Sequence, residues 1–401
     1  MYETEECFMM IKPELRFNGF KGEWEETSLG NLFAERVESD INAEMLSVTM
    51  HDGIIKASEN GRYDNSNSDR SNYKLVLKDD IAYNSMRMWQ GASGCSPYRG
   101  IVSPAYTVII PNKGINSTFF AAYFKTNRLI NKFRLNSQGL TTDTWNLKYS
   151  AFSVISVLYP KDEKEQQQIA TYFVALDKQI SSSSSRLASL KQVKAASLQA
   201  MFPQKGEKVP KIRFNGFEGE WEEQNAGLIF KTINERNFPH LPVVSATQDK
   251  GVVTRDSIGY NIFHDTSNET TYKHIAPGQF VIHLRSFQGG FAYSAIEGIC
   301  SPAYTIMDFK DKRRNHGLYW KYVLTSNDFI KRLELITYGI RDGRTISFDE
   351  FKEMNFLIPS IEEQQQIAAY FTALDKQIAL QTQRLEKLKQ IKAACLDKMF
   401  V

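Results

Sequence analysis

The sequence predicts a mixed α/β protein in which two globular domains alternate with two long helices that pack as an antiparallel coiled coil. One observation is that nearly every recognisable block occurs twice, about 198 residues apart. The block EQQQIATYFVALDKQI, which starts at Glu165, returns as EQQQIAAYFTALDKQI at Glu363, with fourteen of sixteen positions identical. The second observation is that each copy ends in a long run of apolar residues at heptad spacing. Because a repeat fixes the unit of architecture, we expect a pseudo-two-fold internal repeat of two similar units.

Composition restricts the function classes. The chain has 401 residues, of which 42% are hydrophobic and 24% charged, as is usual for a globular protein. Its formal net charge of +3 permits nucleic-acid binding without demanding it. The four cysteines lack CxxC spacing and the six histidines show no ligand spacing shared by the halves, so we expect no metal site. The acidic N-terminus lacks the positive region of a signal peptide and no apolar stretch could span a membrane, which predicts a cytoplasmic protein.

Two kinds of sequence alternate along the chain, one typical of a globular domain and one typical of a long helix, and they set the expected domain boundaries. The globular kind is rich in aromatic and β-branched residues with turn signals; it predicts strands at 153–159 and 279–283, and helices at 116–133 and 318–335. The first 12 residues have no counterpart in the second copy. The expected parts are a leader at 1–12, globular domains at 13–160 and 205–359, and long helices at 161–204 and 360–401.

The heptads of the two long helices can be counted. The first seam is formed by Ile169, Phe173, Leu176, Ile180, Leu187 and Leu190, and the second by Ile367, Phe371, Leu374, Ile378, Leu385 and Leu388. The heptad phase continues through the five serines at 181–185, so we expect a continuous helix rather than a linker there. Glu165 and Glu363 stand three residues after Asp162 and Ser360, which predicts N-terminal capping boxes. Antiparallel packing would place Ser183 beside Gln381.

Catalytic signatures are missing from the sequence. No GxGxxG follows a predicted strand, and GxxxxGK[ST], HExxH, GxSxG and the Asn/Asp-Pro-Pro-aromatic tetrapeptide of amino-methyltransferases do not occur. We therefore expect no catalytic residues and no cofactor bound by this chain.

One pair of loops is suited to contacting a polar, planar group. MRMWQGASG, starting at residue 86, aligns with LRSFQGG, starting at residue 284. Arginine and glutamine make bidentate contacts to guanine and adenine edges, and an aromatic ring can stack or pack beneath the loop. The alternative is a structural turn, which the sharing of the motif by both copies favours for its skeleton. The candidate DNA-binding residues of this pair are Arg87, Trp89, Gln90, Arg285, Phe287 and Gln288.

A second pair of loops differs between the copies and is therefore a better source of specificity. RLNSQGLTTDTW at 134–145 occupies the place of ITYGIRDGRTI at 336–346, and the segments 58–73 and 255–272 form another divergent pair. Polar loops that are merely solvated are the alternative. The candidate readers are Asn136, Gln138, Thr142, Thr144, Tyr338, Arg341, Arg344 and Thr345.

These blocks resemble a known family. GFxGEWEE at the head of each copy, LRSFQGG, SPAYT and the EQQQIAxYFxALDKQI helices are similar to the specificity subunit of type I restriction-modification systems, over nearly the whole chain. The resemblance implies that each globular domain is a target recognition domain that reads one half of a bipartite, asymmetric sequence in double-stranded DNA. It also implies that the helices set the spacing and dock the methylation subunits.

In that family the specificity subunit is not catalytic. Two methylation subunits carry S-adenosylmethionine and methylate adenine at N6, and two restriction subunits use ATP and magnesium for translocation and cleavage. The alternative is a coiled-coil protein-interaction scaffold without direct DNA readout. A self-sufficient DNA methyltransferase is disfavoured by the missing motifs.

Overall fold

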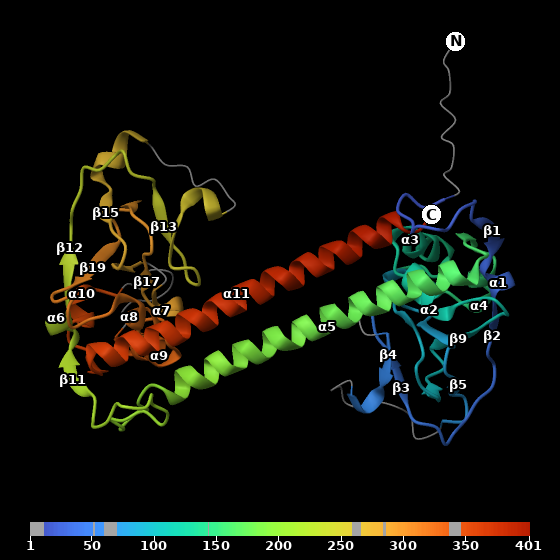
Figure 1. Ribbon diagram of the computed structural model, residues 1–401, viewed down its shortest axis with the longest axis horizontal. Helices are drawn as coiled ribbons and strands as arrows, with labels where there is room; N and C mark the ends of the chain where they lie inside the picture. The colour runs from blue at the N-terminus through green and yellow to red at the C-terminus, as the bar shows by residue number, and fades with distance from the viewer. Residues whose placement is uncertain are drawn as a thin grey trace, which may run out of the picture. The chain divides into compact units, whose positions relative to one another are not determined.

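The computed structural model describes residues 12–50, 53–59, 70–142, 144–258, 266–283, 286–336 and 346–401. The chain forms two compact units (Figure 1). Unit 1 contains the residues up to Ser185 together with Gln383–Val401, and unit 2 contains Arg186–Thr382. Each unit thus combines one globular domain with the first half of the long helix that follows it and the last half of the other long helix.

The two long helices carry the EQQQIA blocks. Helices α5 (Glu163–Ala200) and α11 (Ile361–Lys398) have 38 residues each, which corresponds to about 57 Å at 1.5 Å per residue. The serines at 181–185 are helical, as the heptad phase predicts, because serine costs less than about 0.7 kcal/mol relative to alanine in a helix.

In unit 1 the start of α5 packs against the end of α11. Tyr172 Oη lies 3.2 Å from Cys395 Sγ, and the Lys392 ammonium donates a hydrogen bond to the Asp177 carboxylate. The residue number falls on α11 as it rises on α5, so the two segments run antiparallel.

Unit 2 repeats these contacts with the helices exchanged. Tyr370 Oη lies 2.9 Å from Ser197 Oγ, and Lys194 Nζ donates to Asp375 Oδ1 at 2.6 Å. The predicted antiparallel packing is therefore confirmed within each unit. Every predicted seam residue is buried or half-buried. Ser183 and Gln381 are buried too, but they belong to different units, and their pairing remains a prediction.

The globular part of unit 1 is built from short strands and helices. Its strands are β1 (Glu25–Ser28), β2 (Phe33–Glu35), β3 (Leu46–Val48), β4 (Ile54–Lys56), β5 (Lys74–Val76), β6 (Ile81–Asn84), β7 (Ser93–Cys95), β8 (Gly100–Val102), β9 (Tyr106–Pro111) and β10 (Ser156–Tyr159). Its helices are α1 (Leu29–Leu32), η1 (Ala57–Glu59), η2 (Met88–Gln90), α2 (Ser117–Tyr123), α3 (Asn127–Asn136) and α4 (Tyr149–Ser153).

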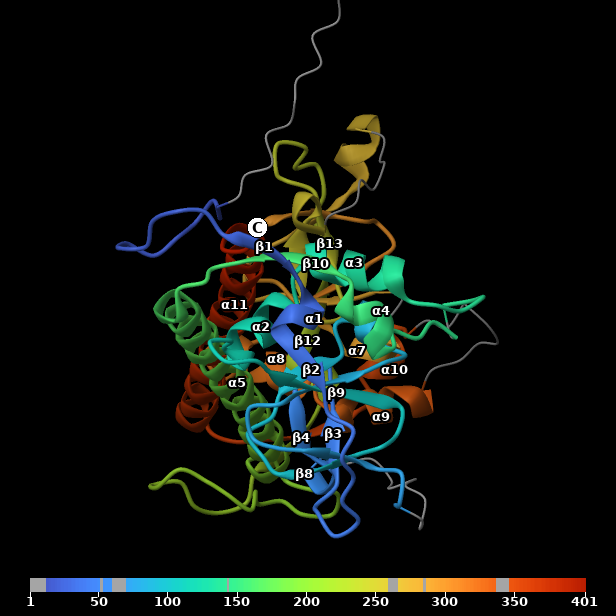
Figure 2. The ribbon, with the colours of Figure 1, turned by 90° about the vertical axis from the view of Figure 1, so that its right-hand side faces the viewer.

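A four-stranded antiparallel sheet in the order β2-β9-β6-β7 organises this unit. Side chains alternate across a strand, so Ile81, Tyr83 and Ile109 enter one core while Ala82 and Val108 enter another. Figure 2 shows α1, α2 and α4 on one side of β2 and β9, and the strands β3, β4 and β8 on the other. Both faces of the sheet are covered, which is why its central strands read as continuous apolar runs.

Unit 2 has the same topology, with the sheet order β12-β19-β16-β17. Its strands are β11 (Glu222–Asn225), β12 (Phe230–Ile233), β13 (Val244–Ala246), β14 (Val252–Thr254), β15 (Lys273–Ile275), β16 (Phe280–Ile282), β17 (Ala292–Tyr293), β18 (Gly298–Cys300), β19 (Thr305–Phe309) and β20 (Asn355–Ile358). Its helices are α6 (Ala226–Ile229), η3 (Arg255–Ile258), η4 (Thr266–Thr271), α7 (Ser286–Gly289), α8 (Gly317–Val323), α9 (Asn327–Ile336) and α10 (Phe348–Phe351).

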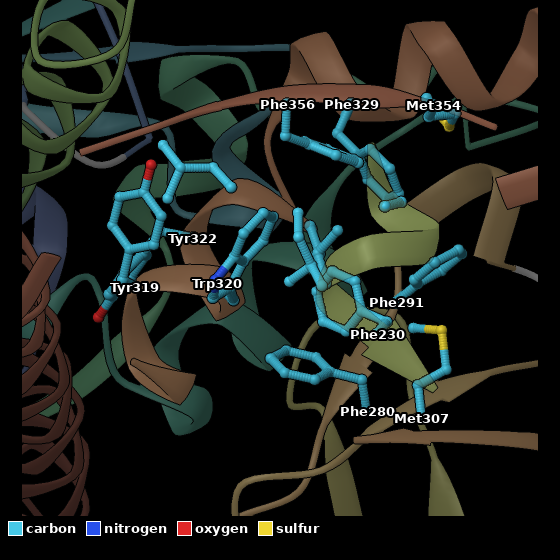
Figure 3. Close-up of a cluster of buried hydrophobic side chains, with 14 of the residues drawn as sticks. Phe230, Phe280, Phe291, Met307, Tyr319, Trp320, Tyr322, Phe329, Met354 and Phe356 are labelled. Atoms are coloured by element: carbon cyan, nitrogen blue, oxygen red, sulfur yellow. The ribbon is translucent and has the colours of Figure 1, made fainter. Parts of the chain in front are cut away.

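Aromatic residues dominate the larger core of unit 2 (Figure 3). Phe230 lies near its centre, with ring centroids 5.0 Å from Trp320 and 6.2 Å from Phe280 in edge-to-face arrangements. Such pairs add about 0.5–1.5 kcal/mol each to the burial of their area. The predicted mixed α/β fold with an internal repeat is confirmed.

The helices expected at 116–133 and 318–335 are each broken in two, so these two predictions are wrong. In unit 1 the chain leaves the helical region at Thr126 (φ −71°, ψ 145°), whose hydroxyl accepts a hydrogen bond from Leu129 N at 3.4 Å and starts α3. Ser326 does the same for α9, through Phe329 N at 3.1 Å. A short hydroxyl side chain favours an N-cap over a helix interior, and this outweighs the continuous apolar pattern.

The repeated head motif fastens each globular domain to its long helix. The Arg16 guanidinium donates two hydrogen bonds of 2.7 Å to the Glu165 carboxylate and a third, of 2.6 Å, to Gly22 O. Glu165 was expected to cap its own helix; this is wrong, because the buried carboxylate is taken up by the arginine. Equivalent bonds join Arg213 to Glu363, although Glu363 N also donates to Ser360 Oγ at 3.4 Å, which is half of the expected box.

Candidate nucleic-acid interface

The first predicted reading loop follows strand β6 of unit 1. It turns through η2 and closes at Gly91, whose φ of 81° lies in the left-handed region that favours glycine. Met88 is fully buried and anchors the turn, whereas Arg87 and Gln90 are exposed. The turn therefore presents these two polar side chains to solvent from a fixed backbone.

The structure brings the two predicted loops of unit 1 together. Trp89 Nε1 donates to Met86 O at 3.0 Å, and its ring meets that of Trp145 edge-to-face at 5.3 Å between centroids. Trp145 belongs to the second predicted loop. Leu147 N, just beyond it, donates to Ser85 O at 2.8 Å. Trp89 thus supports the surface on which both loops lie, which agrees with an aromatic ring packed beneath the loop.

The second loop is a closed turn. Gln138 and Asn146 exchange backbone hydrogen bonds of 3.0 and 2.8 Å across its base. Gly139 allows the close approach of the two sides, since a Cβ there would stand 2.6 Å from the carbonyl of Thr144. Leu140 is fully exposed at the tip. The loop is therefore held in shape by its own backbone.

The predicted readers in this loop divide into two kinds. Asn136 is the last residue of α3, and its side-chain amide donates to a carbonyl one turn earlier at 2.9 Å. The Thr144 hydroxyl donates to Thr141 O at 2.9 Å within the turn. Gln138 and Thr142 are exposed. Direct contact of any of these residues with a base stays a prediction, and it is strongest for Gln138 and Thr142.

The hairpin β3–β4 forms a third element that sequence reasoning missed. Both the backbone N–H and the hydroxyl of Thr49 donate to Gly53 O, at 2.7 and 3.2 Å. The tip touches the first loop, because a Cβ at Gly94 would stand 2.8 Å from Gly53 Cα. The signal was present: SVTMHDG at 47–53 and SATQDKG at 245–251 share the frame SxTxxxG around different tip residues.

Unit 2 presents the corresponding hairpin beside its own loop. Thr247 closes the tip with two bonds of 2.8 Å to Gly251 O. The side-chain amide of Gln248 donates to the amide oxygen of Gln288, and both residues are exposed. A linked pair of amides offers a donor and an acceptor side by side, which is the pattern that pairs with the adenine edge.

Several predicted readers lie outside the described residues. They are Arg285, Tyr338, Arg341, Arg344, Thr345 and the side chain of Phe287. The divergent segments at 58–73 and 255–272 are described only at their ends.

A polar groove of about 530 Å³ lies in unit 1 beside the two loops. Ser85 and Met86 from the first loop, Asn146 from the second and the SPAYT turn at 103–107 contribute to its walls, together with Lys74 and Lys148. Asn146 Oδ1 is buried without a described hydrogen-bond partner. Glu35 lines the groove too, and its carboxylate lies 3.5 Å from the Lys74 ammonium, so the groove carries both signs of charge. Its amide and hydroxyl groups suit contact with base edges.

The described part of the chain holds no group of three or more His, Cys, Asp or Glu side chains placed to bind a metal ion. None of its helices is long and apolar enough to cross a membrane.

The chain is similar to known proteins along both copies of its repeat. Residues 21–192 and 218–390 each match the family described as the type I restriction modification DNA specificity domain. No curated protein sequence matches. Among solved structures, the chain is similar to the S subunit of a type I restriction-modification system from M. genitalium, with a TM-score of 0.58 and 14% sequence identity over 97% of this chain and 99% of that one. The HsdS subunit from Thermoanaerobacter tengcongensis matches with a TM-score of 0.44 and 15% identity over 94% of this chain and 96% of that one.

The two family matches fall on the two copies of the repeat and together span most of the chain. The likeness to the M. genitalium subunit shows the same fold. The chain therefore belongs to the type I restriction-modification specificity subunits, and it is a DNA target-recognition subunit with two specificity domains.

Proposed function

We propose that each unit reads one half of a bipartite, asymmetric double-stranded DNA target. The observation that carries this proposal is that the two units share the backbone arrangement of the hairpin tip and the adjacent loop but differ in the residues at the tip. Both units place a SxTxxxG hairpin tip against the loop after the central strand. The exposed tip of unit 2 is Gln248, Asp249 and Lys250, whereas unit 1 has the sequence MHD there. Two readers of different sequences need the same scaffold and different contacts.

The subunit itself would be non-catalytic. The sequence lacks the nucleotide-binding and amino-methyltransferase motifs, so methylation of adenine at N6 would be carried out by two methylation subunits that hold S-adenosylmethionine. Two restriction subunits would use ATP and magnesium. Such a complex would act on DNA in the cytoplasm.

The long helices would set the gap between the half-sites and dock the methylation subunits. Their 38 residues each support a ruler of fixed length. Removing one heptad from both helices keeps the antiparallel register and should shorten the gap in the methylated motif or abolish methylation. An unaltered gap in an active complex would show that the helices do not set it.

The proposal is tested by exchanging residues 27–160 for the equivalent segment of another family member. The variant is produced with its methylation subunit, and adenine methylation is mapped across the genome. One half of the methylated motif should change and the other should persist. If the motif is unchanged, the first globular domain does not read DNA and the interaction-scaffold alternative gains support.

A further inference from the structure

A half-buried lysine lies at the meeting point of the reading elements of unit 1. Lys125 follows helix α2, in the break that separates it from α3. Its ammonium donates hydrogen bonds to Ser93 O at 2.8 Å, to Met50 O at 3.1 Å and to Gly91 O. Gly91 and Ser93 belong to the first reading loop, and Met50 belongs to the hairpin tip. One side chain thus uses all three of its protons to join two reading elements to the helical layer.

The surroundings of this ammonium are unusual for a lysine. Burial, together with the nearby Lys392 on α11, lowers the pKa of Lys125 to about 8, and Asp177 on α5 opposes this shift. Asp177 itself accepts a hydrogen bond from Lys392. Lys125 forms no described ion pair, so the cost of burying its charge is offset mainly by the three carbonyl dipoles. A lysine that served only solubility would extend its ammonium into water.

Unit 2 joins the same elements without a lysine. Thr325 stands in the place of Lys125, in the turn after α8, and its hydroxyl donates to Lys321 O of that helix at 2.7 Å. The loop instead touches the turn directly, since Phe291 N donates to Leu324 O at 3.0 Å. Gly290 makes this approach possible, because a Cβ there would stand only 2.1 Å from Leu324 O.

Unit 1 meets the same turn through side chains. Its left-handed loop glycine is Gly91, with φ 81° against 77° for Gly290, and a Cβ there would stand 3.4 Å from Ile130 Cδ1 and 3.6 Å from Lys125 Cδ. The loop of unit 1 therefore lies against the Lys125 side chain where the loop of unit 2 lies against backbone. The long side chain of Lys125 spans the distance, and its three donors replace one backbone bond.

We propose that Lys125 is a positioning residue of unit 1: it fixes the first reading loop relative to the hairpin tip and thereby sets the stringency with which this unit reads its half-site, without touching DNA itself. This inference rests on the proposed function of the two units. It assigns to Lys125 an effect confined to one half of the target.

The first test replaces Lys125 by methionine, which keeps an unbranched apolar side chain of similar volume and removes the donors. Methylation by the assembled complex is measured on the full target and on targets with one mismatch in either half. Relative methylation of mismatches in the unit 1 half-site should rise roughly fivefold or more, while mismatches in the other half are rejected as before. Lys132→Met is the matched control, because Lys132 is an exposed lysine on α3 with a single carbonyl partner, Ser156 O at 2.7 Å. An unchanged mismatch ratio in Lys125→Met, or an equal rise in both halves, would overturn the proposal.

The second test has two parts, one on the wild-type complex with DNA and one on the Lys125→Met subunit without DNA. In the wild-type complex, raising the pH from 7 to 9.5 removes the charge of Lys125, so discrimination in the unit 1 half-site should weaken relative to that in the other half. Amide hydrogen exchange of the specificity subunit in Lys125→Met should accelerate at 48–54 and 91–95 and stay unchanged in β6 and β9. If amide hydrogen exchange at these loops is unchanged, Lys125 does not position them, even if replacing residues 27–160 changes the methylated motif. If amide hydrogen exchange is faster but replacing residues 27–160 leaves the motif unchanged, Lys125 positions the loops and only its link to DNA reading is refuted.

Discussion

Arg16 and Glu165 are 149 residues apart in the chain, yet they form two parallel hydrogen bonds of 2.7 Å, and the Glu165 side chain is only 2% exposed. Trp24 Nε1 lies 3.4 Å from the same carboxylate. Arg213 and Glu363 repeat the pair at 2.7 and 2.8 Å. The head motif and the first turn of the EQQQ block are therefore two halves of one clamp in each unit.

Breaking this clamp should unfold one unit before the other. Glu165→Gln leaves the arginine without its counter-charge in a largely buried place, so we expect unit 1 to lose about 3–5 kcal/mol of its free energy of unfolding. Urea denaturation followed by hydrogen exchange of each unit measures this loss. Glu25→Gln is the control, because the Glu25–Lys161 pair is exposed and worth less than about 1 kcal/mol. Equal losses in both variants would contradict the clamp.

The aromatic residue after α11 should matter most to the first globular domain. The Phe400 ring stacks on Tyr123 at 4.8 Å between centroids, and Tyr123 Oη donates to Val401 O at 2.9 Å. Phe400→Ala should cost about 3–5 kcal/mol and speed amide exchange in α2. The matched variant, Phe202→Ala, removes the ring that stacks on Tyr319 at 5.8 Å and should speed exchange in α8 instead. The reverse assignment, in which Phe400→Ala loosens α8, would contradict the composition of the units.

Gln248 and Gln288 should act as one reading group in unit 2. Because their amides are bonded to each other, removing either one leaves its partner free to turn away from the DNA. Each alanine variant should cost about 1–3 kcal/mol in binding and relax one position of the half-site. The double variant should cost clearly less than the sum of the two. Binding to duplexes with each base changed in turn gives these values; additive losses would show that the two residues act independently.

Arg341 and Arg344, from the divergent loop of the second domain, remain predicted base readers. If either arginine forms a bidentate contact to guanine, its replacement by alanine should cost about 1–3 kcal/mol and relax specificity at one position. The same duplex series measures this effect. A loss of equal size on every sequence, with a smaller dependence on salt, would make them phosphate contacts instead.

The stability of unit 1 should depend on the charge of Lys125. The pKa of this group is lowered from 10.5 to about 8 in the folded protein, so between these values the unfolded chain binds more protons. Stability contributed by Lys125 is therefore lowest below pH 8 and rises towards pH 10.5, by at most about 3 kcal/mol. The difference in unfolding free energy between wild type and Lys125→Met should shift by this amount in favour of wild type across that range. A difference that does not change with pH would contradict the lowered pKa.

The repeat and the heptads predicted much of the fold because both can be read from the sequence itself. The repeat is found by comparing one half of the chain with the other, and a heptad is found from residues close together in the chain. A repeated block can be recognised without knowing any tertiary contact, and the fixed spacing of apolar residues such as Ile169 and Phe173 indicates a buried helix face. The break at Thr126 was missed because the apolar pattern continues across it. The hydroxyl cap that decides the matter is a single-residue signal.

The site was predictable only in its parts. Arg87, Trp89 and Gln90 were found from the shared motif, but the contact of Trp89 with Trp145 joins residues 56 apart and depends on the tertiary fold. Lys125 gave no signal, since a lysine near a helix end ordinarily faces water. Its role depends on carbonyls at positions 50, 91 and 93, which no spacing rule connects to it.

The composition of the units has a consequence for protein synthesis. The segment Gln383–Val401 completes unit 1, but the ribosome makes it only after all of unit 2. Phe400 then enters a core whose other members, such as Trp24, were translated at the start. A nascent chain that stalls between the first globular domain and residue 383 carries an incomplete first domain, whose exposed core is a target for chaperones and proteases. The core of the first domain is thus complete only after translation has passed both domains.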